Sequence, residues 1–259
     1  MLIVSCREGF DNPDLFNPKG HTVRRYSDYS YYHEASPTLL QFKHLVRRKK
    51  ILFLIHGFRT EALAVYNAYQ EIRENVESYL PNRYDYIVGY SWPGGDRLWE
   101  WDQAKRAADK AGSSFRFFLE SLECESIDII SHSLGARLAL TALKHTTRKG
   151  LINHYHCMAG AVDDQCLQRR QEFHKSLEGL NRIYLYHSRK DDVLCKAYRI
   201  AEFDSPVGLY GPEDKDYASK HSKIYVVDCK SKISSHSGYR HPSLFKLMAR
   251  TTHHKWMML

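Results

Sequence analysis

Short apolar runs alternate along this chain with longer segments of helical spacing, and this alternation limits the folds that the chain can adopt. Residues 51–55 (ILFLI) are apolar without interruption, as in a strand that is buried on both faces. The next segment, residues 61–80, spaces its apolar side chains as a helix does and ends before Pro81. Repetition of this pattern is typical of a parallel sheet covered by helices. We therefore predict an α/β fold with a mostly parallel sheet of about eight strands and helices on both faces.

The same pattern divides the whole chain into elements of one domain, residues 1–259. Its N-terminal strands and a short helix lie in residues 1–48, and the core of the domain follows in residues 49–259. We expect strands over residues 2–7, 22–26, 51–55, 84–90, 127–130, 155–162, 182–186 and 223–229. We expect helices over residues 38–46, 61–80, 98–122 with a candidate break at Gly112, 134–145, 166–177, 192–202 and 242–251.

Composition limits the classes of function. The chain has 259 residues, of which 43% are hydrophobic, and this is enough for a sizeable core in one α/β domain. The formal net charge is +8, but the basic residues form short groups such as residues 47–50, so we do not expect a nucleic-acid partner. The six cysteines form no CxxC pair, which favours a reducing compartment, and no apolar run approaches the ~18 residues that span a bilayer. We predict a cytoplasmic protein without a membrane span, and the sequence leaves its oligomeric state open.

Two serines and a histidine stand where a predicted strand meets a predicted helix, in residues 131–135 (SHSLG). Ligands of parallel sheets bind beyond the carboxyl ends of the strands, which is where this segment lies. A sharp turn there would hold the Ser133 hydroxyl above the sheet and needs small residues two positions before and after it, here Ser131 and Gly135. The pattern is typical of a nucleophile elbow, with the Leu134 amide directed at an oxyanion.

A second polar segment, residues 56–59 (HGFR), directly follows the apolar run ILFLI. The Phe58 amide is the natural second donor to an oxyanion, because acyl transfer needs two such donors. Arg59 stands beside this loop and is a candidate for binding an anionic substrate, although a surface arginine is the alternative. Trp92, in the segment SWP, is a candidate for shaping the substrate pocket, with structural packing as the alternative.

A serine hydroxyl needs a base and a carboxylate, which in this architecture follow it in the order acid, then histidine. Asp191 and Asp192 follow one predicted strand, and we favour Asp191 because Asp192 can cap the next helix. His236 and His241 follow the last predicted strand, and we favour His236 because His241 adjoins the start of the last helix. Two aspartates at positions 163 and 164, also at a strand end, remain alternatives for the acid.

Five segments in this order resemble blocks of the alpha/beta hydrolase superfamily, namely LFLIHGF, GYSWPGG, IDIISHSLGARLALTAL, YLYHSRKDDVL and SSHSGYRHPSLF. They are similar to a bacterial family of alpha/beta hydrolases of unknown function with H-G-[FY], S-W-P and H-S-[ML]-G blocks. The resemblance implies an alpha/beta-hydrolase fold, and no large insertion suggests a lid domain. It also implies Ser133 as nucleophile, Asp191 as acid and His236 as base, with the Phe58 and Leu134 amides as the oxyanion hole.

We predict a serine hydrolase that cleaves a small-molecule ester or thioester through an acyl-enzyme on Ser133. The alternative is a catalytically silent binding or scaffold protein that retains the fold. We expect no cofactor, and no metal either, because His154 and His156 have no matching set of further ligands. Residues 203–221, an irregular segment between the predicted acid and base, are expected to border the acyl pocket.

Overall fold

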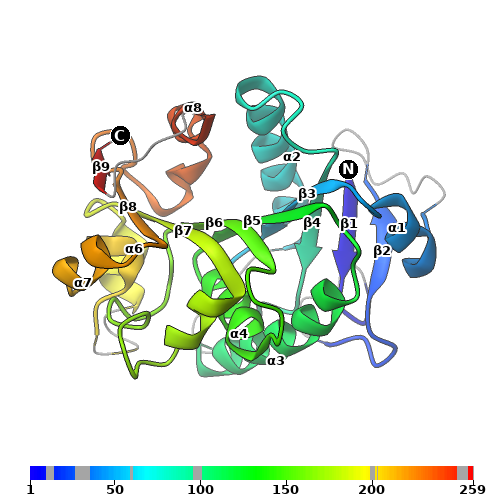
Figure 1. The fold of residues 1–259 in the computed structure, drawn as a ribbon, viewed down its shortest axis with the longest axis horizontal. Helices are drawn as coiled ribbons and strands as arrows, with labels where there is room; N and C mark the ends of the chain where they lie inside the picture. The colour runs from blue at the N-terminus through cyan, green and yellow to red at the C-terminus, as the bar shows by residue number, and fades with distance from the viewer. Residues whose placement is uncertain are drawn as a thin grey trace.

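A mostly parallel sheet runs through the protein (Figure 1). The computed structural model describes residues 1–9, 15–26, 36–58, 61–95, 101–198, 202, 204–249 and 256–258, and within them nine strands form one sheet in the order β2-β1-β4-β3-β5-β6-β7-β8-β9. β2 is antiparallel to β1, and the other neighbouring strands are parallel, as predicted. The strands are β1 (Leu2–Ser5), β2 (Thr22–Arg25), β3 (Lys50–Ile55), β4 (Tyr86–Ser91), β5 (Ser126–His132), β6 (Ile152–Met158), β7 (Leu180–His187), β8 (Ile224–Asp228) and β9 (Trp256–Met258).

Helices cover both faces of this sheet. Figure 1 shows α3 and α4 on one side of it and α2 and α8 on the other. The helices are α1 (Leu39–Leu45), α2 (Ala62–Tyr79), α3 (Trp101–Glu120), α4 (Gly135–His145), α6 (Val207–Tyr210), α7 (Lys215–Lys220) and α8 (Pro242–Ala249), with shorter turns η2 (His174–Gly179), η3 (Leu194–Tyr198) and η4 (His236–Arg240). Among the described helices, none combines the length and the apolar character needed to cross a membrane.

The central strand β3 is apolar along most of its length because helices cover both faces of the sheet (Figure 1). Ile51 to Ile55 in β3 are at most 2% exposed, and β3 lies between β4 and β5. β5, β6, β7 and β8 continue the sheet as parallel neighbours, so their carboxyl ends share one edge. The loops that leave this edge carry the candidate site residues.

Three features of the structure differ from the prediction. β9 was not predicted, because three residues at a sheet edge give too short a pattern. Residues 166–177 form turns and the start of η2 where a helix was expected. Within the region predicted as helix 192–202, residues 192–198 are helical and end in η3, residue 202 is helical, and residues 199–201 lie outside the described residues. The segment predicted as a loop contains α6 and α7.

Helix α3 passes through Gly112 without the candidate break, because this glycine serves helix packing. A Cβ at position 112 would lie 2.6 Å from the carbonyl oxygen of Leu138 and 2.8 Å from Cβ of Thr141, both in α4. The missing side chain therefore lets the backbones of α3 and α4 approach closely.

Replacing Gly112 by alanine tests this packing. Glycine to alanine in a helix interior ordinarily adds up to about 1 kcal/mol of stability. Here we expect the free energy of unfolding to fall by about 1–3 kcal/mol, because the new methyl group meets the backbone of α4. Urea denaturation measures the change, and the exposed Ser113→Ala variant, expected within about 0.5 kcal/mol of the parent, is the control. A Gly112→Ala protein more stable than the parent would contradict the close approach.

Candidate active site

Ser133 has a left-handed backbone at the point where β5 turns into α4. Its φ is 54°, a backbone conformation that residues other than glycine rarely adopt. Three hydrogen bonds hold this turn: the Ser133 amide donates to the Met158 carbonyl at 3.0 Å, and the Ser133 carbonyl accepts from the amides of Ala136 and Ala161 at 3.0 and 3.1 Å. The turn thus has the strained geometry that the sequence predicts for a nucleophile elbow.

Close contacts explain the small residues around the turn. A Cβ at Gly135 would lie 2.5 Å from the carbonyl oxygen of His56, and a Cβ at Gly57 would lie 2.8 Å from Cβ of Ser133. Ser131 stands where the usual pattern has glycine, and its hydroxyl is fully buried and forms a 2.7 Å hydrogen bond with the hydroxyl of Tyr155 on β6. Serine is tolerated there because its polar atom has a partner.

Asp191 and His236 form a hydrogen-bonded pair between two loops at the same sheet edge. The Nδ1 atom of His236 donates to Oδ2 of Asp191 at 2.8 Å, and Asp191 is fully buried. The other carboxylate oxygen, Oδ1, accepts the Leu194 amide at 3.0 Å, so Asp191 also caps the helical turn that follows it. The loops are joined again by the Ser188 hydroxyl, which donates to the Ile233 carbonyl at 2.7 Å.

The alternative residues lie elsewhere. Asp192 is exposed, and Asp191 performs the helix-capping role that was predicted for Asp192. His241 is exposed, and its Nδ1 accepts the amide of Ser243 at 3.2 Å. Asp163 accepts a 2.7 Å hydrogen bond from the hydroxyl of Tyr198 and does not pair with His236.

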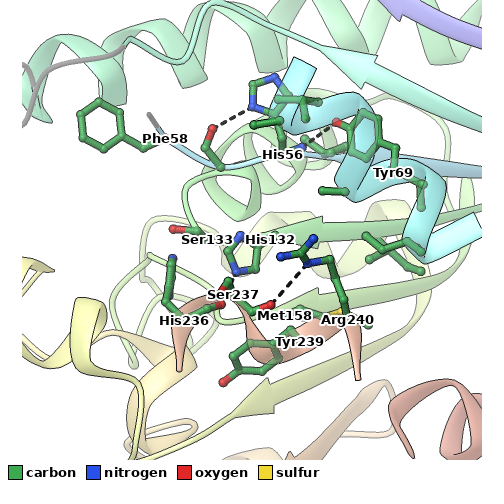
Figure 2. A pocket seen from close by; sticks show the side chains of 18 residues that line it. His56, Phe58, Tyr69, His132, Ser133, Met158, His236, Ser237, Tyr239 and Arg240 are labelled. Atoms are coloured by element: carbon green, nitrogen blue, oxygen red, sulfur yellow. Dashed lines mark hydrogen bonds between the residues drawn. The ribbon is translucent and has the colours of Figure 1, made fainter. Parts of the chain in front are cut away.

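Ser133 and His236 face one cavity of about 340 Å³ (Figure 2). No hydrogen bond joins their side chains, both of which belong to the described part of the chain, and the link between them is their common place on the cavity wall. Such links are often long in structures without substrate. The lining residues are Leu54, Ile55, His56, Gly57, Phe58, Ala64, Val65, Ala68, Tyr69, Ile72, Ile130, His132, Ser133, Met158, His236, Ser237, Tyr239 and Arg240.

His132 holds the loop of His236 in place, a role that was not predicted from the sequence. Its Nε2 atom donates to the backbone carbonyl of His236 at 2.8 Å, and the two rings lie 4.5 Å apart. Burial, and next the neighbouring His236, lower the pKa of His132 to about 3, so its imidazole is neutral at physiological pH. The only sequence signal was its place directly before Ser133.

His56 fixes the peptide that carries the Phe58 amide. Its Nδ1 donates to the Gly57 carbonyl at 2.8 Å (Figure 2). Its Nε2 accepts the amide of Trp92 at 3.2 Å and approaches Nη2 of Arg7 at the same distance. Burial, and next Arg7, hold the pKa of His56 well below its ordinary value. In a trans peptide the N–H points opposite to the C=O, so the bond to Gly57 sets the direction of the Phe58 amide.

The two predicted oxyanion donors belong to the two segments that meet at the Ser133 turn. Leu134 directly precedes α4, and among the described residues its amide donates no hydrogen bond to the protein. Phe58 follows Gly57, whose backbone contacts Ser133, and its ring packs edge-on against Trp101 at 5.7 Å. Arg59, predicted to bind substrate, lies outside the described residues.

The substrate-binding role predicted for Trp92 is wrong in this structure. Trp92 is fully buried and does not line the cavity. Its ring stacks on His56 at 5.4 Å, and its Nε1 donates to the His56 carbonyl at 2.9 Å. Trp92 therefore supports His56 from below, which matches the structural alternative.

Residues 203–221 were expected to border the pocket, and the described part of this segment, 204–221, contributes no residue to the cavity wall. It packs instead against the loop after β6: a Cβ at Gly208 would lie 2.3 Å from the carbonyl carbon of Ala159. The Gly208 amide donates to Gly160, and its carbonyl accepts the amide of Ser188 at 3.0 Å. The segment thus packs against the loop that carries Asp191 and is hydrogen-bonded to it through Ser188.

No group of three potential metal ligands occurs among the described His, Cys, Asp and Glu residues. The two histidines of β6 that the sequence offered as candidate ligands have other partners. His154 interacts with the carboxylate of Asp128 at 3.3 Å, and Nδ1 of His156 forms a 2.9 Å hydrogen bond with the hydroxyl of Tyr186.

Comparison with known sequences identifies one family. The sequence model described as "Alpha/beta hydrolase of unknown function (DUF900)" matches residues 34–246 of this chain. A comparison with curated proteins finds no match. The matched residues include Ser133, Asp191 and His236.

Three solved structures are similar at low identity. An uncharacterized protein from Bacillus cereus ATCC 10987 is 14% identical with a TM-score of 0.41, over 91% of this chain and 56% of its own. An extracellular alpha/beta-hydrolase from a Paenibacillus species is 14% identical with a TM-score of 0.36, over 81% and 89%. Phospholipase PlaB from Legionella pneumophila is 15% identical with a TM-score of 0.31, over 70% and 39%. The chain spans about half the length of the first, and the family assignment rests on the sequence model.

Buried neutral histidines predict a loss of stability in mild acid. Burial lowers the pKa of His21 to about 4 and those of His132 and His156 to about 3, whereas the ordinary value is 6.5. As the pH falls below 6.5 the unfolded chain binds protons at these sites and the folded chain does not. The free energy of unfolding should therefore decrease as the pH falls, by up to about 1.4 kcal/mol per pH unit for each histidine.

Urea denaturation between pH 7 and pH 4.5 measures this slope. His156→Gln keeps a hydrogen-bonding side chain beside Tyr186 but does not titrate, so we expect it to reduce the slope by up to about 1.4 kcal/mol per pH unit. An identical slope in the parent and in His156→Gln would contradict the assignment of a neutral, buried His156.

Proposed function

Since the chain belongs to the family of alpha/beta hydrolases of unknown function, we propose that it is a serine hydrolase that cleaves an ester or a thioester. One observation carries the proposal: the hydrogen-bonded pair of His236 and Asp191 lies at the cavity that the left-handed Ser133 also lines. The carboxylate orients the imidazole, and the imidazole and the serine hydroxyl line the same cavity, which supports the arrangement that activates a serine.

In the first step the Ser133 hydroxyl attacks the substrate carbonyl carbon. Nε2 of His236 takes the hydroxyl proton, because Nδ1 is engaged by Asp191. The buried carboxylate of Asp191 fixes the tautomer and stabilises the imidazolium that forms. The negative charge on the carbonyl oxygen is received by the amides of Phe58 and Leu134, each of which contributes roughly 10²–10³ in rate.

Collapse of the tetrahedral intermediate releases the alcohol or thiol, which takes its proton from His236. An acyl group then remains bonded to Ser133. In the second step His236 removes a proton from a water molecule, and the resulting attack on the acyl-enzyme releases the acid and restores Ser133.

Reaction with a fluorophosphonate probe tests the nucleophile. We expect the parent protein to be labelled once, at Ser133, and Ser133→Ala to lose labelling. His236→Gln and Asp191→Asn should slow labelling by about 10²-fold or more, because the hydroxyl is no longer activated. Intact mass spectrometry and peptide mapping follow the reaction.

The matched control for this experiment is Ser131→Ala, two residues from the proposed nucleophile and in hydrogen-bond contact with Tyr155. It should keep labelling at Ser133. Labelling of Ser133→Ala equal to that of the parent, or no reaction of the folded parent with the probe, would contradict the proposal.

The oxyanion arrangement predicts a second set of kinetic effects. His56→Phe keeps a ring that stacks on Trp92 but removes the donor to the Gly57 carbonyl, so the Phe58 amide loses its fixed direction. We expect kcat for a short-chain p-nitrophenyl ester to fall by about 10²-fold with little change in KM, since the lost interaction acts in the transition state.

The rescue variant is His56→Asn, whose side-chain amide offers a donor near the position of Nδ1. It should recover a substantial part of kcat, while thermal melting of both variants reports the purely structural loss. Equal kcat in His56→Phe and in the parent would exclude the positioning role.

A further inference from the structure

The cavity beside Ser133 extends away from the reacting groups between α2 and η4. Figure 2 shows Ser133, His236 and Phe58 toward one side of the view and Arg240 toward the other. We call the part of the cavity between Ser133 and Arg240 the slot. The whole cavity of about 340 Å³ also includes the space over Ser133. At roughly 30 Å³ per non-hydrogen atom, about that of liquid water, the cavity holds on the order of ten such atoms.

One stripe of α2 makes the slot apolar. Ala64, Ala68 and Ile72 are four residues apart and Val65 lies three residues before Ala68, so they share one side of the helix, and all four line the cavity. The opposite wall includes Leu54, Ile130 and Met158 from the ends of the strands. The two alanines are the small members of the stripe and leave the space that larger side chains would fill.

The charged group at the far side is already neutralised. The Arg240 guanidinium forms an ion pair with Glu71 of α2, and its Nε donates to the Ser237 carbonyl at 3.4 Å. Asn75 of α2 donates through Nδ2 to the Arg240 carbonyl at 3.2 Å. These contacts bridge α2 and η4 on that side of the slot, so a group that enters from Ser133 meets mostly apolar walls and an arginine that is already paired.

The order of the two chemical steps selects which part of the substrate the slot holds. The leaving group must depart while the acyl group is still bonded to Ser133. A leaving group seated in the slot, which the paired side chains bridge at its far side, would have to pass that acyl group to return to the side of Ser133. The acyl chain, which stays bonded until the second step, is therefore the part that suits this pocket.

We infer that the slot binds the acyl chain of an uncharged, unbranched, medium-length acyl ester or thioester, and that Ala68 and Ile72 set the chain length accepted. This inference rests on the proposed serine hydrolase activity. Each further methylene of the acyl chain contacts the wall formed by α2. Each one should therefore raise kcat/KM by about fourfold until the slot is full.

The test is kcat/KM for p-nitrophenyl esters with acyl chains from C2 to C14. In the parent we expect a rise with chain length to an optimum near C8 and then a decline. Ala68→Leu should move the optimum shorter by at least two carbons, while Ile72→Ala should move it longer. Ser78→Leu, an exposed position on the same helix, is the matched control and should leave the profile unchanged.

Two results would overturn the inference while leaving the hydrolase proposal intact. One is turnover that requires Ser133 but has a chain-length profile identical in the parent, Ala68→Leu and Ile72→Ala, each verified as folded by its melting temperature. The other is an Ala68→Leu effect confined to a series of acetate esters of longer alcohols, which would place the leaving group in the slot. Turnover that survives in Ser133→Ala would instead refute the proposed function itself.

Discussion

The left-handed backbone of Ser133 is the constraint on which the rest of the site depends. A residue with φ of 54° is stable only where its surroundings fix it, and here hydrogen bonds from β6 and α4 do so. The turn also requires that no side chain intrude from either side, and Gly57 and Gly135 provide that space. The loop after β3 can therefore lie against the turn after β5, and these two segments carry the amides proposed as the oxyanion donors.

Topology made much of this predictable from the sequence. Parallel strands end at one edge, so polar residues that follow different strands must be neighbours, and Ser133, Asp191 and His236 could be selected on that basis. The choice of Asp191 over Asp192 rested on a capping argument that gave the cap to Asp192. The structure gives both tasks to Asp191, one for each carboxylate oxygen, and sequence patterns contain no sign of such a division.

The remaining features depend on contacts between distant segments, which local patterns do not encode. Trp92 follows a strand at the correct edge, but only packing decides that its ring lies under His56 and not in the cavity. His132 and His56 were visible as parts of motifs, yet their tasks are hydrogen bonds to backbone carbonyls of His236 and Gly57. A three-residue edge strand and the short helices of residues 207–220 are set by the sheet and loops around them.

The neutral state of His132 and His56 suits the charges that the proposed reaction creates. When His236 takes a proton, its positive charge lies against the buried carboxylate of Asp191 and 4.5 Å, ring to ring, from His132. A charged His132 would oppose the protonation of His236. Because burial makes a second cation costly, the pKa of His132 is low and its ring stays neutral. His56 is held neutral by burial and by Arg7, so its Nδ1 remains a donor and its Nε2 an acceptor. Both rings thus act as fixed hydrogen-bonding groups, and the proton that moves in the reaction is left to His236.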